Sequence, residues 1–180
     1  MNVVDGEDIQ GDTADAWQTL DLVNGWLKHA EAKAGVALAT VGVLGGLLYN
    51  LAASLKEPPW WVIAPMVGAI LFMAVGGMCA AVAVVPRLWR KDSATSRIYY
   101  DHIARAYPKK PKSEVRIFQN EFARIIGSKK ALFDELSAQV WTNSHVAATK
   151  FMWGTWAIVC VIVAAFCVAL VACGVAWDLR

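Results

Sequence analysis

The sequence predicts an all-α membrane protein, with three transmembrane helices and two long helices that extend into a cytoplasmic helical bundle. The composition is the first observation: of 180 residues, 57% are hydrophobic and only 18% are charged, whereas about 25% are charged in ordinary soluble domains. The second is that stretches 34–55, 58–86 and 151–177 contain no Asp, Glu, Lys or Arg. Each exceeds the roughly 20 residues that a helix needs to cross a bilayer. This composition excludes intrinsic disorder, and the length excludes a large multidomain enzyme.

Tryptophan placement is the third observation, because six of the nine tryptophans lie at or near the ends of the second and third stretches. An indole buries its apolar ring and keeps its N–H hydrated, so tryptophan concentrates at membrane interfaces. The first stretch follows a long acidic segment, unlike the short basic start of a signal peptide. The six interfacial tryptophans are Trp60, Trp61, Trp89, Trp153, Trp156 and Trp177.

The N-terminal half is expected to hold a disordered acidic segment (1–12), a cytoplasmic stalk helix (13–34) and two transmembrane helices (35–55 and 60–86). The stalk is predicted because apolar residues from Thr13 onward recur three or four apart. This pattern continues without a break into the first charge-free stretch. We therefore expect one helix that begins in the cytoplasm and ends across the membrane.

The C-terminal half is expected to hold a cytoplasmic helical region (87–150) and the third transmembrane helix (151–177). Residues 93–107 and 113–126 are predicted to form two shorter helices, separated by a turn that two prolines mark. Ser128 is expected to cap a long helix that continues to the end of the third stretch. Because both long helices carry an apolar stripe on their cytoplasmic parts, we expect these two stalks to pack together.

Positive charge is concentrated in one part of the chain, which predicts the orientation. Residues 87–150 contain thirteen Lys and Arg and six acids, whereas residues 1–34 contain two Lys and seven acids. Because Lys and Arg stay on the cytoplasmic side, the N-terminus is expected in the cytoplasm and the C-terminus in the periplasm. The basic charges are spread out and flank a membrane, so the lipid bilayer is the expected partner and nucleic acid is not. The basic residues nearest the membrane, which anionic lipid would attract, are Arg87, Arg90 and Lys91.

Catalytic and metal-binding patterns are missing from the sequence. It contains no GxSxG, HExxH, P-loop or GxGxxG motif in a fitting context. The three histidines stand singly, and the cysteines form no CxxC. No acidic residue lies inside a span, which disfavours a transporter-like relay. We therefore expect no enzyme activity, no metal and no cofactor. The cysteines, all inside predicted spans, are Cys79, Cys160, Cys167 and Cys173.

Rows of small residues in the apolar stretches allow helices to approach closely. Gly42 and Gly46 form a GxxxG pattern, and Gly76 with Ala80 forms a similar row. Such rows serve either packing within one chain or self-association between chains, and the sequence leaves both open. Because three spans alone enclose no pore, any conducting or disrupting activity is expected to need a homo-oligomer.

Two polar clusters precede the first and third charge-free stretches. They contain the cations Lys33 and Lys150, the carboxylate Glu31, and the amide and hydroxyl groups of Asn143 and Ser144. One interpretation is that each lysine reaches the lipid interface and the other groups are solvated. The other is a shared ligand-binding site between the two stalks. Its groups suit a small anionic ligand with a base or sugar to hydrogen-bond.

Two motifs in these clusters resemble those of the Pycsar transmembrane effector family. The run Trp26-Leu-Lys-His-Ala-Glu-Ala-Lys-Ala-Gly35 resembles W-I-x-F-A-D-x-K-A-G, with Glu in place of the usual Asp. The run Leu136-x-x-Gln139-Val-Trp-Thr-Asn-Ser144-x-Val-Ala-x-x-Lys150 is similar to L-x-x-Q-I-x-x-N-S-x-I-A-x-x-K. The order of spans and the helical loop agree as well, so the resemblance covers most of residues 15–175.

This resemblance implies a multi-pass effector of the bacterial inner membrane that works beside a pyrimidine cyclase. On phage infection, cyclic UMP (cUMP) or cyclic CMP (cCMP) would bind with its phosphate at Lys33 and Lys150. The effector would then impair the membrane, and the cell would die by abortive infection before phage matures. The alternatives are an effector of another nucleotide-linked defence system, and a ligand-free membrane scaffold or transporter accessory subunit.

Overall fold

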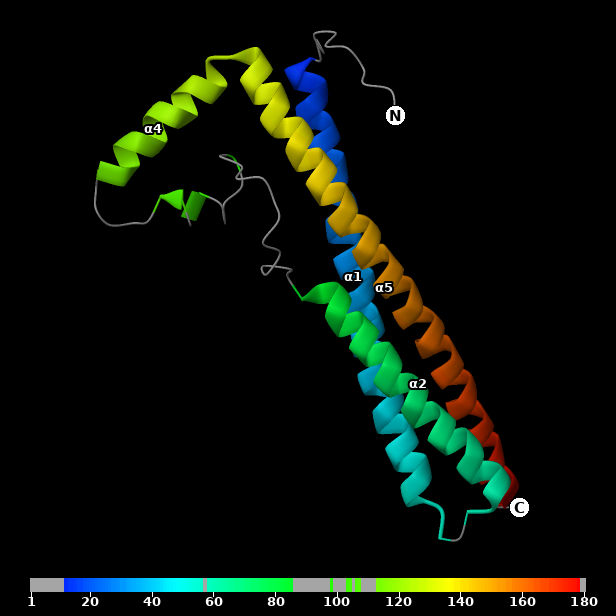
Figure 1. Cartoon of the computed structure of the whole chain (residues 1–180). Helices are drawn as coiled ribbons and strands as arrows, with labels where there is room; N and C mark the ends of the chain where they lie inside the picture. The colour runs from blue at the N-terminus through cyan, green and yellow to red at the C-terminus, as the bar shows by residue number, and fades with distance from the viewer. Residues whose placement is uncertain are drawn as a thin grey trace, which may run out of the picture. The chain divides into compact units, whose positions relative to one another are not determined.

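The computed structural model describes residues 12–56, 58–85, 98, 103–104, 106–107 and 113–178. Every regular element in these ranges is helical, as the sequence predicts. Trp89, the basic cluster at positions 87, 90 and 91, and most of the expected helix 93–107 lie outside the described residues. The helices are α1 (Thr13–Ala53), α2 (Trp60–Val84), α4 (Ser113–Ile126) and α5 (Lys129–Asp178) (Figure 1).

The starts of the two longest helices are fixed by side-chain caps. The backbone N–H of Ala14 donates to Asp12 Oδ1 at 3.0 Å, at the first turn of α1. The N–H of Ala131 donates to Ser128 Oγ at 3.3 Å, at the first turn of α5. Each cap satisfies one of the N–H groups that a helix leaves unpaired at its start. The cap that the sequence predicts at Ser128 is therefore confirmed.

Three of the described helices, α1, α2 and α5, are long and apolar enough to cross a membrane. They have 41, 25 and 50 residues. α2 corresponds to the second charge-free stretch almost end to end. α1 and α5 each begin in a polar segment and continue without interruption through a charge-free stretch, as their periodicity indicates. Within the described residues, three helices could thus serve as the spans that the composition predicts.

The chain divides into two compact units. Unit 1 contains Met1–Gly25 and Leu88–His145, and unit 2 contains Trp26–Arg87 and Val146–Arg180. In unit 1, Ala16 and Leu20 of α1 pack with Leu136 of α5 in a small apolar core.

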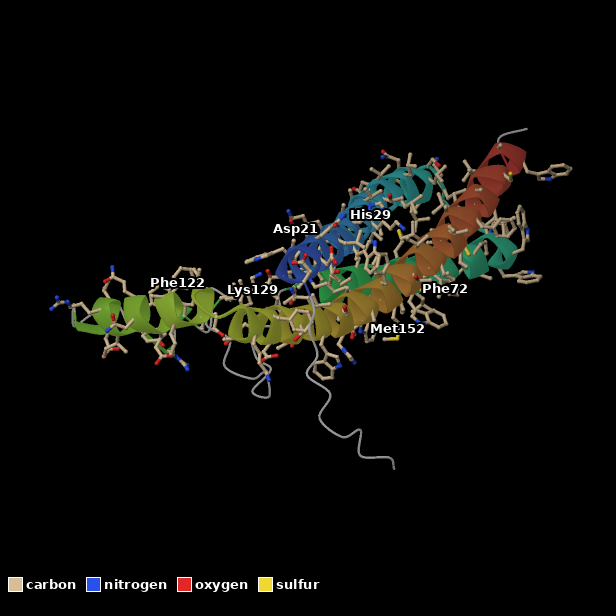
Figure 2. All side chains as sticks on the ribbon, turned by 90° about the horizontal axis from the view of Figure 1, so that it is seen from above. Asp21, His29, Phe72, Phe122, Lys129 and Met152 are labelled. Atoms are coloured by element: carbon tan, nitrogen blue, oxygen red, sulfur yellow. The ribbon has the colours of Figure 1, made fainter. Side chains whose placement is uncertain are left out.

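In unit 2, the later part of α1, all of α2 and the later part of α5 pack around one apolar core. In Figure 1, the connection between α1 and α2 lies at the same end of this unit as the C-terminus. Phe72 and Met152, labelled in Figure 2, lie on the outer surface and are 40% and 50% exposed. Such apolar exposure is expected of helices that face lipid. Core members include Ala37, Leu44 and Leu48 of α1, Val62, Ala69 and Met73 of α2, and Ala157, Val161, Ala164, Val168 and Val171 of α5.

Buried positions along α1 and α5 recur at alternating spacings of three and four residues. In α1 they include Ala30, Ala34 and Ala37, and in α5 Ala157, Val161 and Ala164. A repeat of about 3.5 residues keeps one stripe of a helix facing its neighbour over many turns. This spacing keeps one stripe of each long helix in the apolar core of unit 2.

The glycines of the apolar stretches are of two kinds in the structure. A Cβ built on Gly76 would lie 3.0 Å from Cys160 Cβ, and one on Gly174 would lie 2.8 Å from Val62 Cγ2. These two glycines therefore serve close helix packing within the chain. Gly42 and Gly46, in contrast, have nothing within 4 Å of such a Cβ. The GxxxG pattern thus forms an open face of α1.

Candidate functional site

Glu31 and Lys150 form an ion pair between α1 and α5, inside unit 2. Lys150 Nζ donates to Glu31 Oε1 at 2.6 Å. The side chain of Lys150 is only 4% exposed, whereas that of Glu31 is 42% exposed. A buried ammonium group needs a partner because it has lost its water. Glu31 supplies that partner and remains partly hydrated itself, so the two members of the pair are not equivalent.

Lys33 lies two residues beyond Glu31 but has a different environment. Its side chain is exposed, and Nζ lies 5.6 Å from the centroid of the Phe151 ring. This distance is within the range of a cation–π contact. The two side chains line a shallow recess of about 50 Å³, whose walls are completed by Ala30, Gly154, Thr155 and Ile158. Lys33 is thus an accessible cation beside an aromatic ring.

Asn143 and Ser144, the remaining sequence-predicted site residues, lie in unit 1. Asn143 Nδ2 donates to Asn24 Oδ1 at 3.0 Å, so this amide links α5 to α1. Ser144 Oγ donates to the carbonyl of Val140 at 2.7 Å, one turn back in its own helix. Its hydroxyl oxygen still has acceptor capacity. The five predicted residues therefore divide between the units: Glu31, Lys33 and Lys150 in unit 2, and Asn143 and Ser144 in unit 1.

Asn24 and Phe151 are the residues that sequence reasoning missed. The signal for Asn24 is its spacing: it precedes Glu31 by seven residues, as Asn143 precedes Lys150. Both contacts join residues that are 119 positions apart. In a heptad repeat, residues seven apart occupy equivalent positions. The same offset would therefore have suggested that the two polar pairs form between the same two helices.

These residues can bind an anion, and their polar pairs can select the register of α1 against α5. Lys150 is committed to Glu31 in this structure, so Lys33 is the predicted site cation that stays open to a ligand. A polar pair in an otherwise apolar helix interface favours one register over others. Among the described residues, no three His, Cys, Asp or Glu side chains lie close enough together to hold a metal ion.

The comparisons with known proteins agree on one family. Residues 15–177 match the model of the Pycsar effector protein domain. The chain is also 32% identical to the Pycsar effector protein PtPycTM of Propioniciclava tarda over 166 residues, which cover 91% of this chain and 80% of that protein. No solved structure matches the chain. The matched region includes α1, α2, α4 and α5 almost completely, and with them both polar pairs and the Lys33 recess. This chain therefore belongs to the Pycsar effector family, whose members act in antiviral defence at membranes.

Proposed function

We propose that this protein is a membrane effector of a bacterial anti-phage system that a cyclic pyrimidine nucleotide, cUMP or cCMP, activates. A partner cyclase makes the nucleotide during infection. The activated effector impairs the inner membrane, and the infected cell dies before phage matures. The observation that carries this proposal is the accessible Lys33 beside Phe151, within a chain that matches the Pycsar effector domain from residue 15 to residue 177.

Lys33 is the proposed contact for the nucleotide phosphate. An exposed ammonium group can meet a phosphate without first breaking an ion pair, whereas Lys150 would have to leave Glu31. The phosphate carries a full negative charge, and charge-assisted hydrogen bonds are among the strongest that a side chain makes. Lys150 joins the ligand in a second step, when α1 and α5 separate enough for the phosphate to compete with Glu31.

The Glu31–Lys150 pair is the proposed link between ligand binding and the membrane-spanning parts. Both residues precede the charge-free stretches of their helices by only a few positions. A ligand that pulls Lys33 or Lys150 away from its resting contact favours a different packing of α1 against α5. Binding can shift this equilibrium only by the difference in affinity between the two packings. The buried ion pair provides this difference in affinity, because it is intact in only one of the two packings.

The Asn24–Asn143 pair and Ser144 have proposed roles in unit 1. The amide pair favours the resting register of α1 against α5. Asn143 and Ser144 also remain candidate contacts to the base or sugar of the nucleotide, Asn143 through its second amide N–H and Ser144 through its hydroxyl oxygen as an acceptor. Substituting each of them separately tests this role without touching the lysines.

The proposed arrangement in the membrane follows from the charge distribution. The N-terminus and residues 87–150, with their thirteen Lys and Arg, face the cytoplasm. This places Lys33 and Lys150 on the side where the cyclase releases its product. The active form is a homo-oligomer, because three spans enclose no pore. The open glycine face of α1, with Gly42 and Gly46, is the surface available for that assembly.

Calorimetric titration of the detergent-solubilised full chain tests the proposal. The titrants are cUMP and cCMP, with cyclic AMP as the control. One pyrimidine nucleotide should bind selectively, and Lys33→Ala should weaken that binding at least tenfold. Lys28→Ala is the matched control, since Lys28 is another exposed lysine of α1 that does not line the recess.

The outcomes separate the proposal from its alternatives. If the folded protein binds neither pyrimidine nucleotide, the activation proposal fails and a different messenger or a ligand-free scaffold is favoured. If the nucleotide binds and Lys28→Ala weakens it as much as Lys33→Ala, the phosphate contact at Lys33 is wrong.

A further inference from the structure

The recess beside Lys33 has a composition that its role in phosphate binding does not explain. Its lining includes the ring of Phe151 and also Gly154, where a built Cβ would meet nothing within 4 Å. The recess therefore presents one cation and one aromatic face with open space next to them. A cyclic nucleotide has a matching pair of features, one anionic group and one aromatic base.

The size of the recess limits how a nucleotide can bind there. Its volume is about 50 Å³, whereas pockets that enclose small ligands usually measure about 300–1,000 Å³. A whole nucleotide cannot be enclosed in this state, so its base must lie against a surface instead. An aromatic ring can bind a base on such an open surface, because every base has a π-face that stacks on the ring without an enclosing pocket.

We propose that Phe151 is the base-stacking residue of this site, and that it helps to determine which nucleotide binds. The inference rests on the proposed function and names a further residue of the same site. In the resting state, Lys33 occupies the face of the ring at 5.6 Å. On binding, Lys33 moves to the phosphate and the base takes its place on the ring. The cation–π contact thus keeps the aromatic face in place until a ligand offers the cation a better partner.

Phe151 is well positioned for this role. Its side chain is half-buried, so the ring is partly packed against the protein and partly open. Its carbonyl accepts a hydrogen bond from Thr155 Oγ1 at 2.9 Å, one turn further along α5. It directly follows Lys150 in the sequence of α5. A stacked base would therefore contact the helix that carries the proposed switch.

Calorimetry with three variants of the full chain tests the stacking. Phe151→Leu removes the aromatic face and keeps an apolar side chain. Loss of one base–aromatic stack should weaken the selected pyrimidine nucleotide about 5- to 150-fold. Phe151→Tyr should retain affinity within about threefold of wild type, because the ring remains. Phe166→Leu is the control, since Phe166 is a 65% exposed aromatic residue of α5 outside the recess.

A second measurement uses the unmutated protein. The 5-iodo derivative of the bound nucleotide is activated by light, and the crosslinked peptide is identified by mass spectrometry. The label should lie on Phe151. Labelling confined to other aromatic residues overturns the inference, whatever the variants do.

The failures of the two proposals are distinguishable. If wild-type protein binds neither pyrimidine nucleotide, the proposed function itself fails. If wild-type protein binds one of them and Phe151→Leu binds it equally well, the stacking role alone is overturned and the proposed function stands.

Discussion

Replacing Glu31 with alanine should destabilise the protein much more than replacing its partner Lys150 with methionine. The reason is the difference in burial, because the Lys150 side chain is 4% exposed and the Glu31 side chain is 42% exposed. Glu31→Ala leaves an ammonium group without water and without a counter-charge. Lys150→Met removes that group and keeps an unbranched apolar chain, while Glu31 gains water at its exposed edge. Removing one or the other member of this ion pair should therefore lower the stability of the protein by unequal amounts.

The size of the difference can be worked from the burial. Removing one partner of a fully buried pair costs about 3–5 kcal/mol. Because Glu31 is partly hydrated, we expect a loss nearer to that of a hydrogen bond to a charged group, about 2–3 kcal/mol. In a chain of this length, such a loss lowers the melting temperature by about 4–12 °C. Lys150→Met should cost less than about 1 kcal/mol, since an exposed carboxylate loses little on losing its partner.

Thermal unfolding of the detergent-solubilised protein, followed by tryptophan fluorescence, measures both effects. The double variant Glu31→Ala with Lys150→Met should melt close to Lys150→Met alone, because the group that needs Glu31 is gone. Glu31→Gln is the control that keeps an acceptor oxygen and removes the charge, and it should fall between wild type and Glu31→Ala. Equal losses in the two single variants would contradict an effect of unequal burial, as would a Glu31→Ala variant as stable as wild type.

Three further predictions concern packing, register and orientation. Gly174→Ala would place a methyl group 2.8 Å from Val62 Cγ2, so it should lower the free energy of unfolding by about 1–3 kcal/mol. Gly42→Ala has open space around it and should lower that free energy by nothing. Equal melting temperatures of the two variants would contradict the packing role of Gly174. Asn143→Ala should lower the free energy of unfolding by about 1 kcal/mol, because Asn24 loses its partner. The double variant Asn24→Leu with Asn143→Leu should recover that stability and weaken the response to the nucleotide in a growth assay. A double variant less stable than Asn143→Ala would rule out the register role. Alkaline phosphatase fused to the C-terminus should be active if that end is periplasmic, and a fusion active only at the N-terminus would reverse the orientation.

The helices could be predicted from the sequence because their signals are local. Charge-free stretches of 22 to 29 residues and apolar spacings of three and four are properties of one segment, and helix formation follows from them. The cap at Ser128 belongs to the same class, because it needs only the residues that follow it. The continuation of α1 and α5 from polar segments into the spans was predictable for the same reason.

The pairing of side chains could not be predicted in the same way, because it depends on the register between two helices. The sequence places Lys33 and Lys150 at equivalent positions before their spans, and nothing local distinguishes them. In the structure, Lys150 lies inside the interface against Glu31, and Lys33 lies outside it against Phe151. A shift in register changes which residues meet across a helix interface. This is why Phe151 is recognised as a neighbour of Lys33 only once α1 and α5 are placed together.

Purified protein in liposomes that contain a self-quenched dye tests activation most directly. We propose that a cyclic pyrimidine nucleotide alone converts this protein into a membrane-impairing form. Adding cUMP or cCMP should release the dye, with no release by cyclic AMP, from protein-free liposomes, or from liposomes that carry Lys33→Ala. Nucleotide binding without dye release would contradict the claim, and so would equal release in the absence of any nucleotide.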